Sequence, residues 1–209
     1  GAREALSFET ISYIGFPFSI SETFQQRNTN LSQIAAYNLV QDMHELCLQR
    51  NKELVIYLSM GFGNPYGDLW DPLLVEHWAD RFVQMGIETI SVADTVGVAS
   101  PENIATVFAS LTYAFPDIEF GAHLHTEAHN WLPKIDAAYE NGCRRFDGAI
   151  KGFGGCPMAQ NTLVGNMPTE HLIYYFEQER ADFLLNKDAF LDAMNIANSI
   201  FMPNDVAVH

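Results

Sequence analysis

Positive charge is scarce in this 209-residue chain, which has 11 Lys and Arg against 26 Asp and Glu and a net charge of −15. Proteins that bind nucleic acids use Lys and Arg to neutralise the phosphate backbone. The composition therefore argues against nucleic acid as the main partner. It also implies that any phosphate-bearing substrate needs a local group of basic side chains within an acidic protein.

Cysteine is also scarce, and long apolar runs are absent. The three cysteines, Cys47, Cys143 and Cys156, are odd in number and contain no CxxC pair, so no disulfide framework is expected. No run of 18 apolar residues is present, and the first residues, GAREALSF, contain no apolar core of a signal peptide. These absences favour a cytoplasmic protein with no membrane partner.

Short apolar, β-branched runs alternate with longer amphipathic stretches along the chain. The runs predict strands and the stretches predict helices, and this alternation is typical of βα units that build a parallel sheet. We expect strands at Ile11–Gly15, Leu54–Ser59, Thr89–Asp94, Glu119–His125 and Arg145–Ile150, and helices over residues 32–50, 72–86, 130–142, 169–179 and 188–201, with another that starts at Ser100 and Pro101.

Five βα units fit either a doubly wound sheet or part of a (β/α)₈ TIM barrel, and periodicity alone does not choose between them. A complete barrel needs about 250 residues. The chain starts without Met in what reads as a helix, so we expect the first strands of a barrel to lie upstream of Gly1. No linker divides the sequence, and residues 1–209 are therefore expected to form a single, partial catalytic barrel domain.

The segment GAHLHTEAHN places His123 and His125 one residue apart at the end of an expected strand. Side chains alternate along a strand, so both imidazoles share one face while Leu124 points to the other. Two charged imidazoles this close would repel each other unless acceptors or a cation lay nearby. The pair therefore predicts either a metal site, since His is a common metal ligand, or two hydrogen-bonded core histidines.

A glycine-rich segment, KGFGGCPMAQN, follows the last expected strand and carries Cys156. Its three glycines give the backbone conformational freedom, which suits a loop that brings a reactive thiol over a substrate. The alternative is a small buried cysteine in an ordinary glycine turn. Cys47 and Cys143 lie at helical or helix-end positions and are expected to be structural.

Two further polar residues lie at the expected carboxyl edge of the sheet. Asp94 ends a strand and could orient a ligand, bind a metal or cap local amides. Asn166, in GNMPTE, precedes a helix whose N-cap is expected to be Thr169. Its amide oxygen could bind a hard cation, although a turn asparagine is the alternative.

Three segments in this order resemble the 3-hydroxy-3-methylglutaryl-CoA lyase family, which belongs to the metal-dependent TIM-barrel lyase and Claisen-condensation superfamily. The resemblance covers residues 11–173, and SISETFQQRNTN and YLSMGFGNPYGD are also similar to family segments. The GGCP loop separates the lyases of that superfamily from the synthases, which share only the HxH strand. The three segments are ADTVGVASP, GAHLHTEAHNWLPKIDAAYENG and FDGAIKGFGGCPMAQNTLVGNMPTEHL.

The resemblance implies a carbon–carbon lyase that cleaves 3-hydroxy-3-methylglutaryl-CoA to acetoacetate and acetyl-CoA. It implies that His123, His125 and Asn166 bind a divalent cation, Mg²⁺ or Mn²⁺, that Cys156 is catalytic, and that Asp94 lines the active site. Either His123 or Asp94 would then act as the base, and Cys156 would protonate the enolate. The implied partner is an acyl-CoA substrate, and a homo-oligomer is left open.

The chain departs from the family pattern at two places. No segment matches the Arg-Asp-Gly of the family's first strand, whose Asp is a metal ligand; the similar residues 145–148 lie on a different strand. Thr126 occupies a position where many relatives have Asp, so a negative charge beside His125 is missing.

Three alternatives are a related aldolase-type lyase, a Claisen-type synthase and a catalytically inactive paralogue. Thr126 leaves the related lyase open, the missing upstream acid leaves the inactive paralogue open, and the GGCP loop speaks against the synthase. A zinc hydrolase is disfavoured by the asparagine ligand and by the absence of an HExxH helix. The positive charge that a CoA ester needs could come from Arg27, Arg144, Arg145 or Lys151, each of which could instead be an ordinary surface charge.

Overall fold

A computed structural model of the protein describes residues 1–155 and 165–201. Cys156, which carries one of the catalytic predictions, lies outside the described residues. Five parallel strands form the main sheet in the order β1-β2-β3-β4-β6, as expected from the βα pattern. These strands are β1 Tyr13–Ser19, β2 Glu53–Ser59, β3 Thr89–Ala93, β4 Glu119–His123 and β6 Arg145–Asp147.

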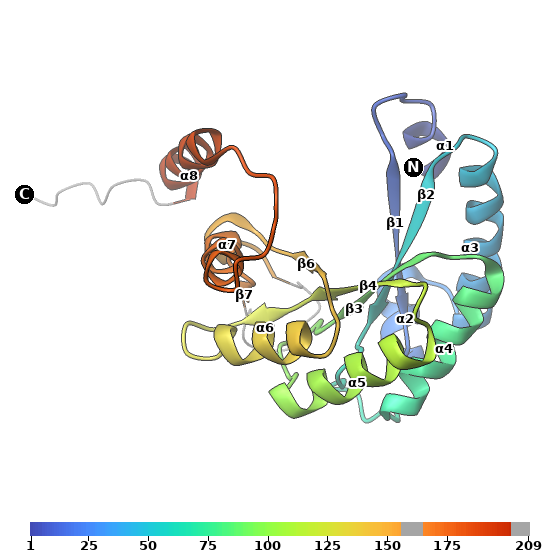
Figure 1. The fold of residues 1–209 in the computed structure, drawn as a ribbon. Helices are drawn as coiled ribbons and strands as arrows, with labels where there is room; N and C mark the ends of the chain where they lie inside the picture. Colours follow the sequence, from blue (N-terminus) through green and yellow to red (C-terminus); the bar gives the residue numbers. More distant parts are fainter. Residues whose placement is uncertain (156–164, 202–209) are drawn as a thin grey trace, which may run out of the picture.

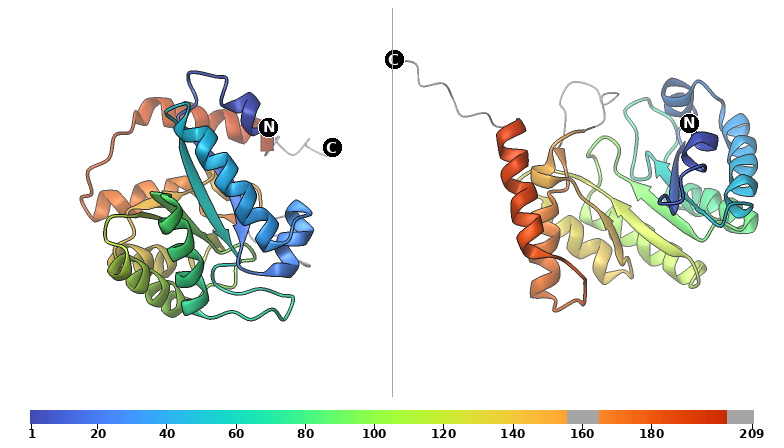
Figure 2. Two further views of the ribbon diagram at one scale, coloured as in Figure 1. Left: turned by 90° about the vertical axis from the view of Figure 1, so that its right-hand side faces the viewer. Right: turned by 90° about the horizontal axis from the view of Figure 1, so that it is seen from above.

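Helices form an arc around the outside of this sheet, with α7 and α8 beyond β6 (Figures 1 and 2). A second, two-stranded antiparallel sheet, β5 with β7, lies at the carboxyl ends of the main strands. We call it the β5–β7 ribbon. The remaining elements are α1 Ala2–Ala5, α2 Glu22–Thr29, α3 Gln33–Leu48, α4 Pro72–Met85, α5 Pro101–Ala114, β5 His125–Thr126, α6 Trp131–Glu140, the 3₁₀ turn η1 Ile150–Gly152, β7 Gly165–Asn166, α7 Thr169–Gln178 and α8 Lys187–Phe201.

Local signals explain where most helices begin and end. The Ser100 hydroxyl accepts a hydrogen bond from the Asn103 amide and caps α5, as expected. Gly142 follows α6 with a φ of +91°, a backbone conformation that glycine adopts without strain. The expected cap of α7 was wrong, because Pro168 is the N-cap and Thr169 is already the first helical residue.

Several elements differ from the expected pattern. The first strand was expected at Ile11–Gly15 and spans Tyr13–Ser19, and β6 ends at Asp147 rather than Ile150. Helix α2 was not predicted, because its sequence ETFQQRNT is polar and buries only Phe24 and Gln25. The strand expected over residues 119–125 is divided at Leu124, so that His123 ends β4 and His125 begins β5.

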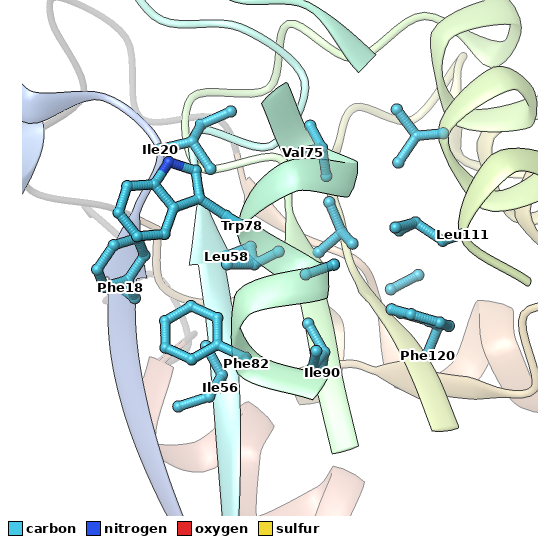
Figure 3. Close-up of a cluster of buried hydrophobic side chains, with 14 of the residues drawn as sticks. Phe18, Ile20, Ile56, Leu58, Val75, Trp78, Phe82, Ile90, Leu111 and Phe120 are labelled. Carbon is cyan, nitrogen blue, oxygen red and sulfur yellow. The ribbon is translucent and has the colours of Figure 1, made fainter. Parts of the chain in front are cut away.

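The outer face of the sheet is packed with apolar side chains. Phe18 lies under α4, with its ring centre 4.5 Å from that of Trp78 and 5.0 Å from that of Phe82. Ile56, Ile90 and their neighbours continue this layer toward α5 (Figure 3). Burial of this face fixes the helices against the sheet. The labelled members of the cluster are Phe18, Ile20, Ile56, Leu58, Val75, Trp78, Phe82, Ile90, Leu111 and Phe120.

The opposite, inner face carries polar side chains. Strand register aligns Tyr57 with Ser91, and it aligns His123 with both Ala93 and Asp147. Because side chains alternate along each strand, these residues share the face that the apolar layer does not use. The polar face ends at the carboxyl edge of the sheet, where active sites of parallel α/β folds are found.

Replacement of Phe82 by alanine is expected to lower the free energy of unfolding by about 3–5 kcal/mol, because Phe82 is fully buried and contacts Phe18 and Trp78. Urea unfolding followed by circular dichroism measures the change. Leu73→Ala on the same helix is the matched control, since Leu73 is 71% exposed, and it should change stability by less than about 0.5 kcal/mol. Equal losses for the two variants would contradict this packing.

Candidate active site

A cavity of about 260 Å³ lies at the carboxyl ends of the strands. Its walls come from β1 to β4, from α2 and from the β5–β7 ribbon. The residues of the described chain that line it include no carboxylate. They are Pro17, Phe24, Asn28, Tyr57, Ser59, Ala93, Thr95, His123, His125, Gly155 and Asn166.

The two histidines meet in this cavity. Their ring centres are 5.6 Å apart, with the rings tilted by 55°. His125 is 4% exposed, whereas the His123 side chain is 35% exposed. Leu124, between them, is buried on the apolar side. The structure thus has the alternation that the HxH pattern predicts, although the strand is divided between the two residues.

Asn166 is brought beside His125 by the β5–β7 ribbon, in which the two residues are register partners. Asn166 is therefore a strand residue rather than the turn asparagine that was the alternative. Its side-chain Nδ2 donates to the Phe153 carbonyl at 2.9 Å. This hydrogen bond orients the amide and leaves Oδ1 as the atom that can face a cation.

The glycines of the KGFGG segment allow the chain to pass close to Asn166. Gly152 and Gly154 have φ values of +66° and +95°. A Cβ at Gly152 would lie 2.7 Å from the Asn166 carbonyl oxygen, and one at Gly154 would lie 2.9 Å from its Nδ2. A side chain at either position would therefore clash with Asn166, so the segment needs glycine there.

Asp147 supports His123, and the sequence analysis did not select it. Its Oδ2 lies 3.2 Å from His123 Nδ1. A proton on Nδ1, shared with this carboxylate, leaves the lone pair of Nε2 for a cation. Asp147 lies opposite His123 because of the register between β4 and β6, and the sequence pattern alone carries no signal for that register.

Tyr57 closes the other side of His123. The two rings meet edge to face, with their centres 5.9 Å apart. Burial raises the pKa of the Tyr57 hydroxyl, and the negative charge of Asp147 raises it further. Tyr57 therefore stays protonated near neutral pH and serves the site as a neutral wall rather than as a base.

Asp94 does not face this cavity, which differs from the expectation that it lines the active site. The side chain is buried, and its Oδ2 lies 2.8 Å from Lys134 Nζ while Oδ1 accepts a hydrogen bond from the Ala99 amide. Its neighbours Ala93 and Thr95 line the cavity instead. Because both carboxylate oxygens are engaged away from the cavity, the geometry opposes a role for Asp94 as base.

The other two cysteines are structural in character, as expected. Cys47 and Cys143 are both buried, and neither forms a disulfide. Burial raises the pKa of the Cys143 thiol to about 12. Its Sγ lies 3.2 Å from the Arg145 carbonyl oxygen, so the thiol is held within the core and is unreactive at neutral pH.

The four basic candidates fall into two groups. Arg144 donates to the Cys143 carbonyl, and Arg145 forms an ion pair with Glu119 at 2.8 Å, so both have structural contacts. Arg27 is exposed on α2, and its guanidinium lies over the Tyr66 ring at 4.7 Å from the ring centre. Lys151 lines a neighbouring cavity of about 240 Å³ that shares Asn166 with the first.

The described residues include three side chains that could hold a metal ion together. Among the described residues, no group of three or more His, Cys, Asp or Glu side chains could hold a metal ion. The set that converges consists of two imidazoles and one amide, from His123, His125 and Asn166. Nitrogen and neutral oxygen donors of this kind fit a divalent cation and leave other coordination positions for water, substrate or a carboxylate.

No helix in residues 1–155 or 165–201 is long and apolar enough to cross a membrane. Buried apolar side chains instead pack between the helices and the sheet.

The profile of the HMGL-like family matches residues 8–197. Hydroxymethylglutaryl-CoA lyase YngG of Bacillus subtilis is 31% identical over 160 residues, which are 77% of this chain and 53% of that protein. (R)-citramalyl-CoA lyase of Chloroflexus aurantiacus is 33% identical over 121 residues, 58% of this chain and 38% of that protein. The crystal structure of hydroxymethylglutaryl-CoA lyase from Pseudomonas aeruginosa aligns with a TM-score of 0.86 at 25% identity, over 97% of this chain and 67% of that chain.

The chain spans about half the length of the curated relatives it matches. Its parallel sheet is that of the TIM-barrel lyases, which confirms the barrel prediction over a doubly wound sheet. The relatives are named as lyases of two acyl-CoA esters, hydroxymethylglutaryl-CoA and (R)-citramalyl-CoA. With the family profile matched over residues 8–197, the chain belongs to the HMGL-like family.

Proposed function

We propose that the protein containing this chain is a metal-dependent lyase that cleaves 3-hydroxy-3-methylglutaryl-CoA to acetoacetate and acetyl-CoA. The observation that carries this proposal is the convergence of His123, His125 and Asn166 on one cavity, bordered by Gly155 of the GGCP segment. Residues of two separate sequence motifs, the HxH strand and the GGCP segment, thus line the same cavity.

A divalent cation, Mg²⁺ or Mn²⁺, would be held by one imidazole nitrogen of His123, one of His125 and Oδ1 of Asn166. When bound, the cation would supply Lewis-acid stabilisation of negative charge on the 3-oxygen of the substrate. The proton of the 3-hydroxyl would pass to solvent water, and a proton from water would later restore the donor that protonates the enolate. The protein contributes the orientation of these ligands. Asp147 holds the His123 ring through Nδ1, and the Phe153 carbonyl holds the Asn166 amide.

His123 has two predicted roles, as metal ligand and as base, and they compete for the same atom. Nδ1 already faces Asp147, so Nε2 is the nitrogen left for the cavity. A nitrogen that holds a cation cannot also accept a proton. The position of His125 and Asn166 beside it favours the role of His123 as a ligand.

Cys156 is proposed as the acid that completes the reaction. Its thiol would give a proton to the enolate carbon of acetyl-CoA, which leaves a thiolate on the loop. Gly155, the preceding residue, lines the cavity. Lys151, which lines the neighbouring cavity, and Arg27, exposed on the helix that supplies Asn28 to the first cavity, are proposed to attract the phosphates of the CoA group.

Citramalyl-CoA is the alternative substrate. The (R)-citramalyl-CoA lyase of Chloroflexus aurantiacus is also about one third identical to part of this chain. Both substrates are 3-hydroxyacyl-CoA esters with a distal carboxylate, so the same metal ligands could serve either. Thr126, buried next to His125, is the residue here that departs from the common family pattern.

The full-length protein with Mg²⁺ is expected to release acetoacetate from 3-hydroxy-3-methylglutaryl-CoA in a coupled assay. EDTA should abolish the product, and Cys156→Ala should lower kcat by at least about 100-fold because the proton donor is lost. Citramalyl-CoA, followed by release of pyruvate, is the competing substrate. Product from citramalyl-CoA alone would replace the proposed substrate, and no product from either ester would refute the lyase proposal.

Asp147→Ala is expected to weaken Mn²⁺ binding by roughly 10- to 100-fold, since loss of the partner of a ligating histidine has effects of this size. Electron paramagnetic resonance titration of free Mn²⁺ measures the affinity. His129→Ala is the matched control, because His129 is 76% exposed and pairs only with Glu127 among the described residues. Unchanged affinity in a folded Asp147→Ala variant would show that the carboxylate does not support a ligand.

A further inference from the structure

Lys134 is a fully buried lysine beside the proposed metal site. The family resemblance assigns it no role. It lies in the first turn of α6 and is 2% exposed. A buried ammonium group is costly unless its protons meet acceptors. The contacts of Lys134 therefore show which parts of the structure depend on it.

Three segments meet at the Lys134 ammonium group. Nζ donates to Asp94 Oδ2 at 2.8 Å and to the His125 carbonyl oxygen at 2.8 Å, and more distantly to the Gly97 carbonyl at 3.5 Å. An ammonium group has three protons, so these acceptors account for all of them. Lys134 thus joins α6 to the end of β3, to the loop that follows it, and to β5.

Asp94 anchors this group from the other side. Its second carboxylate oxygen accepts from the Ala99 amide at 3.0 Å, and its own amide donates to the His123 carbonyl at 2.9 Å. The carboxylate and its backbone are therefore fixed to both the loop and the HxH strand. Because Asp94 is held in place, the Lys134 ammonium group that binds it is also held in place.

We propose that Lys134 is a positioning residue for the metal site, acting through its hydrogen bond to the His125 carbonyl. The bond fixes the backbone from which the His125 ring projects. Because His125 pairs with Asn166 in the β5–β7 ribbon, the same bond also sets the position of the amide ligand. This inference rests on the proposed metal site.

A purely stabilising role makes a different prediction from a positioning role. Buried ion pairs are often replaceable by apolar groups with no loss of stability, provided that both charges are removed. A positioning role instead requires a donor to the His125 carbonyl, whatever the fate of the charges. Removal of both charges, with and without a donor, therefore separates the two roles.

The experiment compares two double variants of the full-length protein, K134M/D94N and K134Q/D94N. Both remove the buried charges; methionine has no donor for the His125 carbonyl, whereas the glutamine amide keeps one. We expect both to fold, with melting temperatures close to that of the wild type. Mn²⁺ affinity, measured by electron paramagnetic resonance, should fall at least about 10-fold for K134M/D94N and stay within about threefold for K134Q/D94N.

K52M is the matched control for the loss of a lysine that donates to backbone carbonyls. Lys52 Nζ donates to the carbonyls of Phe8 and Glu9, at the amino ends of the strands and away from the cavity. Its Mn²⁺ affinity should equal that of the wild type. A general effect of lysine loss on metal binding would appear here and would overturn the inference.

The outcomes are distinguishable. If folded K134M/D94N binds Mn²⁺ as the wild type does, the positioning role is wrong while the metal site stands. If K134M/D94N does not fold, the test rests on K134Q/D94N. A tenfold weaker Mn²⁺ affinity of folded K134Q/D94N would show that the charge, and not the hydrogen bond to the His125 carbonyl, supports the site, and would overturn the positioning role. If the wild type itself binds no Mn²⁺, the metal site of the proposed function fails, and the positioning role fails with it.

Discussion

Burial of one face of the parallel sheet is the constraint on which the other features depend. Phe18, Ile56 and Ile90 point outward against the helices, and this leaves Tyr57 and His123 on the inner face. Since all five main strands run the same way, their carboxyl ends meet at one edge. The cavity lies at this edge, where the polar residues at the carboxyl ends of the strands meet.

Two charges are buried within the region that this packing creates. Transfer of Lys134 and Asp94 out of water costs free energy that their mutual attraction roughly offsets, so the pair is a weak source of stability. The pair contributes oriented hydrogen bonds rather than stability. Each hydrogen bond of the pair has a defined geometry, and apolar packing cannot hold the His125 carbonyl in the same way. The pair thus fixes the position of the His125 backbone, which apolar packing alone would leave less well defined.

Period-two patterns predict the sheet and the shared face of the histidine pair, and the same alternation also determines the face on which Asp94 lies. In TISVAD, Ile90 and Val92 are on the apolar face, so the same alternation places Asp94 there too, away from the cavity. Asp147 depended on the register between β4 and β6, which a single sequence does not supply. The sequence carries no signal for the burial of Lys134, because its contacts with Asp94, Gly97 and His125 are tertiary.

The described lining of the cavity carries no carboxylate, although the protein is strongly acidic. The protein has a net charge of −15, whereas the described lining of the cavity has two imidazoles, two amides, three hydroxyls and no carboxylate. Asp94 and Asp147, the nearby acids, are turned toward Lys134 and His123. An acyl-CoA with its phosphates and distal carboxylate would be repelled by the molecule as a whole. A cation held among neutral ligands would therefore act twice, in the chemistry and as the local positive charge that allows an anionic substrate to enter.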